Sequence, residues 1–301
     1  MVKNNNTKIL ENGEFFIKIN GIKHWCKIAG KQHNTTPIII IHGGPGGNNY
    51  TYERTIGPLL EKFATLIYYE QRGCGRSDGP EDNEAYSIPI LISDLAELCN
   101  IFKLEKIIPL GFSFGGQLAL EFTLTYPNLV EKIIVQAPSE FYDNDRNYSI
   151  QLFGFEHISE GKVKKKIKKI ISSQKKIREK WLDVWNSVDT ETVDKFLFHN
   201  KEFAVEVRNI WRESKLLSSD LMFEALINKK NEIRLMERIS QIKAPTLIMT
   251  GLHDRNVGVD LNRDFASKII NSKLVIFEKS AHFPDIEEPE KYAKFIEEFI
   301  D

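Results

Sequence analysis

The sequence predicts an α/β fold in which a mostly parallel sheet of eight strands carries helices on both faces and an inserted helical cap. Short apolar runs alternate with helical patterns in residues 1–138 and again in residues 238–301, as in parallel sheets. Residues 139–237 break this alternation, because they are polar, poor in strand patterns and helical in spacing. We therefore expect a core built from the two outer segments and a cap built from the middle one.

The predicted strands follow one another along the core. Residues 14–29 alternate enough to predict an opening antiparallel hairpin with Asn20-Gly21 as its turn. Six further apolar runs predict strands at residues 37–41, 65–70, 107–111, 133–136, 246–250 and 273–277. The first of these runs is continuous and β-branched, which is typical of a central strand buried on both faces. At 301 residues and 42% hydrophobic composition, the chain is long enough for one sizeable core and an insertion.

A glycine-flanked serine follows the apolar run at 107–111. In Gly111-Phe112-Ser113-Phe114-Gly115 the pattern predicts a turn sharp enough to raise Ser113 above the sheet. Such a turn leaves no room for Cβ atoms at positions 111 and 115, which explains the glycines. The apolar spacing of residues 117–124 then predicts a buried helix. Ser113 is therefore the candidate nucleophile.

The loops after the last two predicted strands carry groups that could activate this serine. A serine hydroxyl needs a base to take its proton, and the base needs a third group to hold its tautomer. His282 is the expected base and Asp254 the expected acid. The order Ser113, Asp254, His282 is that of α/β-hydrolases. Glu140 and Asp143, after the run at 133–136, stay open as alternative acids.

The loop His42-Gly43-Gly44-Pro45-Gly46-Gly47 offers backbone donors for the oxyanion that forms when a serine attacks a carbonyl group. We expect the N–H groups of Gly44 and Phe114 to form the oxyanion hole, with Gly43 as the alternative donor. His42 is expected to brace the loop. A phosphate-binding turn is disfavoured because no lysine follows at the required spacing.

Two motifs carry a resemblance to a known family. His42-Gly43-Gly44-Pro45-Gly46, together with Glu70-Gln71-Arg72-Gly73-Cys74-Gly75-Arg76-Ser77, resembles the proline iminopeptidase branch of the α/β-hydrolases, which includes the tricorn-interacting aminopeptidases. The resemblance covers nearly all of residues 15–138 and 240–300. It implies a serine hydrolase that releases an N-terminal residue from small peptides through an acyl-enzyme. This chain has Glu70 where the family usually has Asp, and Phe114 where it usually has Trp.

The cap is expected to select the substrate. Ile177, Trp181, Val184, Trp185 and Val188 recur at helical spacing, and packing between cap helices explains this stripe better than a ligand box does. Trp185 is nevertheless retained as a candidate substrate-binding residue. The segment from Trp181 to Asn186 resembles the family's Trp-rich cap segment, with altered spacing and Asn in place of its acid. That departure argues against a strict preference for N-terminal proline.

The resemblance also implies that the protein recognises a free α-ammonium group, which calls for carboxylates beside the pocket. Glu202, Glu206 and Glu213 of the cap are the candidates. The basic stretch at residues 162–169 could face an anionic partner, but a solvated outer face of the cap explains it better.

Composition excludes several other classes. A net charge of −1 argues against a nucleic-acid-binding surface over the whole chain. Three scattered cysteines imply no disulfide framework. The N-terminus lacks an apolar signal region, and no apolar run reaches the length of a membrane span, so we expect a cytoplasmic protein without a membrane partner. No cofactor and no metal site are expected, and the oligomeric state is unknown.

Other functions stay open at this point. An esterase, a lactonase or a hydrolase of carbon–carbon bonds would use the same triad on another small carbonyl substrate. Haloalkane dehalogenases and epoxide hydrolases are disfavoured, because those relatives carry Asp where this chain has Ser113. A non-catalytic receptor that binds a ligand in the pocket is a lesser alternative.

Overall fold

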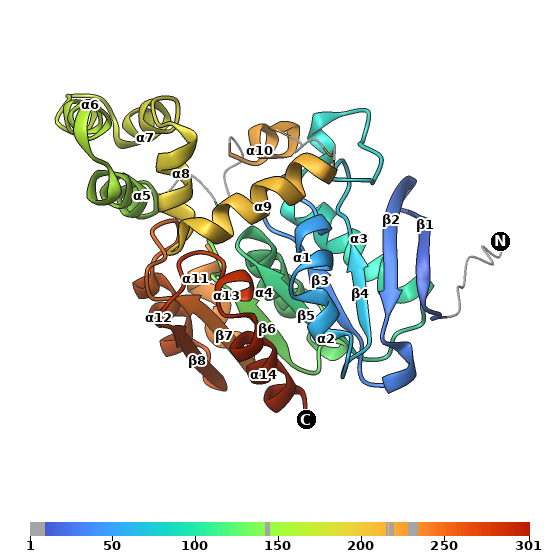
Figure 1. Ribbon diagram of the computed structural model, residues 1–301. Coiled ribbons are helices and arrows are strands. Elements are labelled where there is room, and N and C mark those ends of the chain that lie inside the picture. Colours follow the sequence, from blue (N-terminus) through green and yellow to red (C-terminus); the bar gives the residue numbers. More distant parts are fainter. Residues whose placement is uncertain (1–9, 142–144, 215, 217–219, 228–233) are drawn as a thin grey trace.

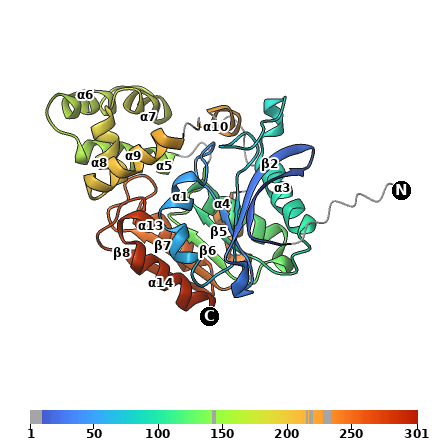
Figure 2. The same ribbon diagram turned by 45° about the vertical axis from the view of Figure 1, so that its right-hand side comes forward.

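Figures 1 and 2 show the computed structural model of the chain, which describes residues 10–141, 145–214, 216, 220–227 and 234–301. One sheet of eight strands runs through the core in the order β1-β2-β4-β3-β5-β6-β7-β8. The strands are β1 (Gly13–Ile19), β2 (Ile22–Ala29), β3 (Ile38–Ile41), β4 (Leu66–Tyr69), β5 (Ile108–Phe112), β6 (Ile133–Gln136), β7 (Thr246–Gly251) and β8 (Ser272–Phe277).

Strand direction follows the sequence prediction. The hairpin of β1 and β2 pairs antiparallel, and β2 also pairs antiparallel with β4. All the remaining neighbours pair parallel. The predicted eight-stranded, mostly parallel sheet is confirmed.

Helices cover both faces of the sheet. The core helices are α1 (Tyr50–Arg54), α2 (Gly57–Leu60), α3 (Ile88–Ile101), α4 (Phe114–Thr125), α11 (Leu235–Arg238), α12 (Val259–Lys268), α13 (Pro284–Glu287) and α14 (Pro289–Ile300). Short 3-10 helices lie at Lys31–His33, Asn83–Ala85, Pro127–Leu129 and Ile239–Gln241. Figure 1 shows α1, α2 and α14 on one face of the sheet and α3, α4 and α12 on the other.

Strand β3 shows why the sheet needs two layers of helix. Ile39 and Ile41 belong to the apolar core on the α3 and α4 side, whereas Ile38 and Ile40 belong to the core on the α1 and α14 side. Successive side chains of a strand point to opposite faces, so a run of four isoleucines is stable only when both faces are covered. This burial fixes β3 at the centre of the sheet and places the loop after it beside β5.

The segment between β6 and the 3-10 turn before β7 is helical. It contains α5 (Asp145–Ile158), α6 (Gly161–Ile171), α7 (Ile177–Trp185), α8 (Thr190–Leu197), α9 (Lys201–Ser214) and α10 (Asp220–Ile227), followed by α11. An apolar cluster of its own holds α5 to α8 together. Figures 1 and 2 show these four helices gathered at one end of the molecule, while α9 extends back over α1. The boundaries 139–237 stay our proposal for the extent of the cap.

Within the described residues, no helix combines the length and the apolarity that crossing a membrane requires.

Candidate active site

Ser113 lies at the turn between β5 and α4 with φ 55° and ψ −121°, a backbone conformation that a side-chain-bearing residue rarely adopts. The neighbouring glycines permit the turn. A Cβ at Gly111 would lie 2.1 Å from the carbonyl oxygen of Gly115, and a Cβ at Gly115 would lie 2.1 Å from that of Ile41. The local geometry is therefore that of a nucleophile elbow, with Ser113 on the wall of a cavity.

His282 and Asp254 are in direct contact. The Nδ1 atom of His282 lies 3.0 Å from Oδ2 of Asp254, while Oδ1 of Asp254 accepts hydrogen bonds from the N–H groups of Asn256 (2.8 Å) and Val257 (3.0 Å). Burial alone would raise the pKa of Asp254, but His282 and these N–H groups outweigh it and hold the pKa below its ordinary value. Asp254 therefore stays ionised beside His282, and His282 lines the same cavity as Ser113.

The alternative acids do not occupy this position. Glu140 is buried elsewhere, where its carboxylate accepts a hydrogen bond from the N–H of Met236 (3.0 Å) and pairs with Arg234 (3.2 Å). It thereby ties the first residues after β6 to the segment that leads back to β7. Asp143 lies outside the described residues. Asp254 is the carboxylate in contact with His282.

The glycine loop after β3 faces the same cavity. Gly43, Gly44 and Gly47 are among its lining residues. Gly44 has φ 125°, and a Cβ there would lie 2.6 Å from the backbone nitrogens of Gly46 and Gly47, so only glycine fits. Phe114 is the first residue of α4, where a backbone N–H has no acceptor within the helix. These positions suit the predicted oxyanion donors Gly44 and Phe114, with Gly43 beside them.

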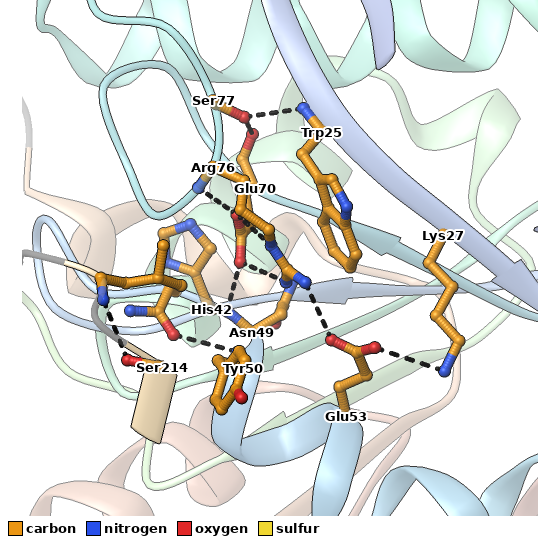
Figure 3. A network of polar contacts seen from close by, with 12 residues as sticks. Trp25, Lys27, His42, Asn49, Tyr50, Glu53, Glu70, Arg76, Ser77 and Ser214 are labelled. Atoms are coloured by element: carbon orange, nitrogen blue, oxygen red, sulfur yellow. Dashed lines mark hydrogen bonds and ion pairs between the residues drawn. The ribbon is translucent and has the colours of Figure 1, made fainter. Parts of the chain in front are cut away.

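A polar network lies next to the glycine loop, where the loop after β4 meets Asn49 (Figure 3). The carboxylate of Glu70, which is 0% exposed, accepts hydrogen bonds from the Nη2 (2.7 Å) and backbone N–H (2.6 Å) of Arg76 and from the N–H of Asn49 (3.3 Å). The guanidinium of Arg76 stacks 3.2 Å from the ring centroid of Trp25. Glu70, which departs from the family pattern, thus anchors the loop after β4 to the start of α1.

His42 is part of this network. Its Nε2 accepts a hydrogen bond from the N–H of Gln71 (3.1 Å), and its Nδ1 lies 2.9 Å from the carbonyl oxygen of Gly43. Burial, only partly offset by the bond to Gly43, lowers the pKa of His42, so the ring is neutral. His42 joins the β3 loop to the β4 loop, as the sequence predicts.

The cavity has a volume of about 730 Å³ and lies between the core and the cap. Its core wall carries Ser113, His282, the glycine loop and one buried carboxylate, Asp285. Its cap wall is mostly aromatic and aliphatic: Phe141, Tyr148, Trp181, Leu182, Trp185, Leu197, Val207, Trp211, Leu216, Phe223 and Ile227. Trp185, a predicted substrate-binding residue, is in that wall.

The three predicted cap glutamates do not reach the cavity. Glu202, Glu206 and Glu213 have exposed side chains and are absent from the cavity wall. Helical phase explains this, because Val207, Trp211 and Ser214 follow one another at intervals of four and three residues and form the cavity-facing side of α9. The glutamates lie on other sides of that helix, so the expectation that they flank the pocket is wrong.

Asp285 is a site residue that the sequence reasoning missed. It lies in the first turn of α13, is 4% exposed, and accepts a hydrogen bond from Nε2 of Gln136 at 2.7 Å. Burial raises its pKa to about 7, although Gln136 and His282 oppose the shift. The available signal was its place three residues after His282, because both residues lie in the segment after β8, which carries the predicted base.

Two neutral amides were missed as well. Asn256, in the Asp254 loop, has its Nδ2 atom 3.2 Å from Nε2 of His282, and Gln151 of α5 donates to Oδ1 of Asn256 at 2.7 Å. The position of Asn256 two residues after Asp254 was a usable signal. No sequence pattern singles out Gln151.

Across the described part of the chain, no group of three or more His, Cys, Asp or Glu side chains is placed to hold a metal ion. The cysteines Cys26, Cys74 and Cys99 are buried, and none of them forms a disulfide bond. Burial raises the pKa of Cys74 well above its usual range, so this thiol near the glycine loop is no competing nucleophile.

Comparison with known proteins agrees with this geometry. The family model of the alpha/beta hydrolase fold matches residues 36–289, so the chain belongs to the α/β-hydrolase family. Among curated relatives, the proline iminopeptidase of Saccharolobus solfataricus is 27% identical over 96% of this chain and 92% of its own length. That of Heyndrickxia coagulans is 26% identical over 95% of this chain and 98% of its own length. The resemblance predicted from the sequence is confirmed.

Solved structures show the same fold. The proline iminopeptidase of Mycobacterium smegmatis superposes with a TM-score of 0.72 at 18% identity, covering 96% of this chain and 97% of its own. An esterase from Exiguobacterium antarcticum superposes with a TM-score of 0.70 at 22% identity, covering 96% and 99%. At these identities the likeness concerns the fold. Family membership and curated relatives together support the predicted class of enzyme, a serine hydrolase.

Proposed function

We propose that this chain is an aminopeptidase that releases the N-terminal residue of small peptides through an acyl-enzyme. The observation that carries the proposal is the contact of His282 with the ionised Asp254 on the cavity that also holds Ser113 and a buried carboxylate, Asp285. The sequence relatives named proline iminopeptidase support the same reaction. A short-peptide substrate and a cytoplasmic location belong to this proposal.

The chemistry divides into two steps. In the first, His282 takes the proton of the Ser113 hydroxyl while Oγ attacks the carbonyl carbon of the first peptide bond. The N–H groups of Gly44 and Phe114 stabilise the oxyanion, a contribution of about 3 to 4 kcal/mol per donor. The tetrahedral intermediate then collapses, the C–N bond breaks, and His282 returns its proton to the leaving amine.

In the second step, water hydrolyses the ester on Ser113. His282 takes a proton from the water as its oxygen attacks, and the same oxyanion donors stabilise the second tetrahedral intermediate. Collapse releases the free amino acid and returns the proton to Oγ of Ser113. Throughout both steps Asp254 stays ionised and stabilises the cationic form of His282 that each step creates.

Asp285 is the residue that we expect to bind the free amine of the substrate. An ammonium group in a mostly apolar cavity needs an opposite charge, because an unpaired buried charge is strongly unfavourable. Asp285 supplies a carboxylate in the core wall, and a cation beside it favours its ionised form. The apolar cap wall then suits a small apolar first side chain, of which proline and alanine are examples.

An esterase is the second candidate. The aromatic cap wall would accommodate an uncharged acyl group equally well, and the esterase from Exiguobacterium antarcticum has the same fold. A lactonase or a hydrolase of carbon–carbon bonds would use the same triad and the same apolar cavity. A receptor would bind a ligand in the cavity without turnover.

A paired rate panel on purified protein tests the proposal. The substrates are prolyl and alanyl arylamides, the same arylamides with an acylated amine, and short-chain aryl esters. We expect cleavage of the free-amine arylamides, loss of this cleavage when the amine is acylated, and no activity in Ser113→Ala. Ser267→Ala, at an exposed position in α12, is the matched control and should retain full activity.

Ester cleavage without arylamide cleavage would replace the proposal with the esterase. Arylamide cleavage that survives in Ser113→Ala would overturn the nucleophile assignment itself.

A further inference from the structure

A chain of side-chain hydrogen bonds joins the cap to the catalytic histidine. The indole N–H groups of Trp181 and Trp185 both donate to Oε1 of Gln151, at 2.6 and 2.9 Å. Nε2 of Gln151 donates to Oδ1 of Asn256 at 2.7 Å, and Nδ2 of Asn256 lies 3.2 Å from Nε2 of His282. We call Trp181, Trp185, Gln151 and Asn256 the relay.

The donor and acceptor roles along the relay follow from its first members. An indole N–H can only donate, so Gln151 must turn its carbonyl oxygen to the tryptophans and its amide nitrogen to Asn256. Asn256 must then accept with Oδ1 and present its NH₂ group to His282. Nε2 of His282 therefore accepts, and the ring proton sits on Nδ1, where Asp254 accepts it at 3.0 Å.

This tautomer is the one that the reaction needs, since the base must offer an unprotonated Nε2 to Ser113. However, the relay also engages that atom. Nε2 has one lone pair, and Asn256 is its hydrogen-bond partner here. Among the hydrogen bonds of the described residues, none joins His282 to Ser113. The arrangement is a resting one, in which the tautomer is correct and the base is not yet free.

The relay is also placed to respond to substrate. Trp181, Trp185, Gln151 and Asn256 all line the cavity, so a bound molecule contacts them directly. The backbone of Asn256 makes two further contacts. Its N–H donates to Asp254, the triad acid, and its carbonyl oxygen accepts from Gln151 at 3.2 Å. A shift of the tryptophans thus changes the position of Gln151, and a shift of Gln151 changes the partner of His282.

We propose that Gln151 and Asn256 are positioning residues that fix the tautomer of His282 and hold its Nε2 until a substrate under the cap displaces them. The inference rests on the triad assigned in the proposed function, and it does not depend on which carbonyl substrate is cleaved. Asn256 acts through its contact with Nε2 of His282, and Gln151 acts through Asn256.

The charged groups around His282 belong to two segments. Asp254 and Arg255 lie in the loop after β7, and Asp285 and Glu287 lie in α13. The cap contributes the neutral Gln151 to the relay. A substitution at Gln151 therefore leaves all four of those charges in place. A carboxylate introduced there also attracts a proton to His282 directly, so a shift reports on the relay only where the neutral variant Asn256→Ala shows it too.

Gln151→Glu reverses the relay while preserving side-chain size. The new carboxylate still accepts from both indoles, but it can no longer donate to Oδ1 of Asn256. Asn256 must turn its amide over, so that Oδ1 faces Nε2 of His282 and favours a proton there. We expect the acidic limb of the pH profile of kcat/KM to move up by about one pH unit, with about a tenfold loss on that limb and no loss on the plateau above it.

Gln174→Glu is the matched control, because it adds the same charge at an exposed position of the cap and should keep the parent profile. Asn256→Ala is the second variant. It removes the donor to Nε2, so its acidic limb should also move up, by less than that of Gln151→Glu. A merely structural role would lower kcat/KM equally at every pH.

Parent-like acidic limbs in a folded Gln151→Glu protein would overturn the proposal. If that variant does not fold, as judged by circular dichroism, the limb of Asn256→Ala decides by the same criterion. Activity retained in Ser113→Ala would instead overturn the triad, so the two failures are distinguishable.

Discussion

The two walls of the cavity are built differently. The core wall depends on backbone geometry at strand ends: the left-handed φ of Ser113, the glycine at position 44 and the loop that carries His282. The cap wall consists mostly of side chains on helices, and two of them, Trp211 and Leu182, are 45% and 40% exposed. The comparison teaches that the reaction depends on positions that tolerate little change, whereas substrate choice depends on surfaces that can change without disturbing the sheet.

Asp254→Asn tests the core wall and should have the largest effect. The amide cannot stabilise the cationic form of His282, and it favours the wrong tautomer, so we expect kcat to fall about 10⁴-fold. Steady-state kinetics on the best substrate of the panel measures this.

Glu140→Gln is the matched comparison, because Glu140 is an equally buried carboxylate that does not contact His282. It should keep kcat within about tenfold of the parent, with its main effect on stability. Equal losses of kcat in the two variants would contradict the assignment of Asp254, and not Glu140, to the triad.

Asp285→Asn tests the one charged group that the core wall presents to the cap. Burial raises the folded-state pKa from 3.8 to about 7, so between these pH values the unfolded chain has lost a proton that the folded chain keeps. The stability from Asp285 is therefore complete below pH 3.8 and is lost as the pH rises through 7. The parent should lose unfolding free energy between pH 5 and pH 8 that Asp285→Asn does not lose. The variant's unfolding free energy, taken relative to the parent's, should therefore be about 1 to 4 kcal/mol higher at pH 8 than at pH 5.

Chemical denaturation of parent and variant at pH 5 and pH 8 gives this difference. The same variant should raise KM for free-amine arylamides about 10-fold or more, since it removes the charge that pairs with the ammonium group. A variant with unchanged KM and an unchanged pH dependence of stability would show that Asp285 neither binds the amine nor titrates near neutrality.

Glu202→Gln, Glu206→Gln and Glu213→Gln should have the smallest effect. Their side chains are exposed and do not face the cavity, so each variant should stay within about twofold of the parent in kcat and KM. A large rise of KM in any one of them would mean that α9 turns when substrate binds.

The core was predictable because its signals are local. Apolar runs marked the strands, and a glycine-flanked serine marked the elbow, since a turn that raises Ser113 excludes side chains at two defined positions. Chain order then separated Asp254 and His282 from other polar loop residues. Each inference needed only the few residues around it and the rule that parallel strands end at the same edge of a sheet.

The cap was less predictable because its contacts are not local. The spacing in α9 shows which positions share a side of the helix, but it does not show which side meets the core, and the glutamates were misplaced for that reason. Gln151 and Asn256 lie 105 residues apart, and a glutamine in an amphipathic helix is ordinarily a solvated one. Only the packing of α5 against α7 brings that amide under two tryptophans.

The path of the chain into and out of the cap has an evolutionary consequence. The helical segment leaves the sheet after β6 and returns at β7, and these two strands are direct neighbours that pair parallel. Exchanging the whole segment for another would therefore leave strand pairing intact and keep the nucleophile, base and acid in place. Such an exchange could replace one specificity with another in a single event. A transplanted segment would need its own amide, or another neutral donor, in the place where Gln151 donates to Oδ1 of Asn256.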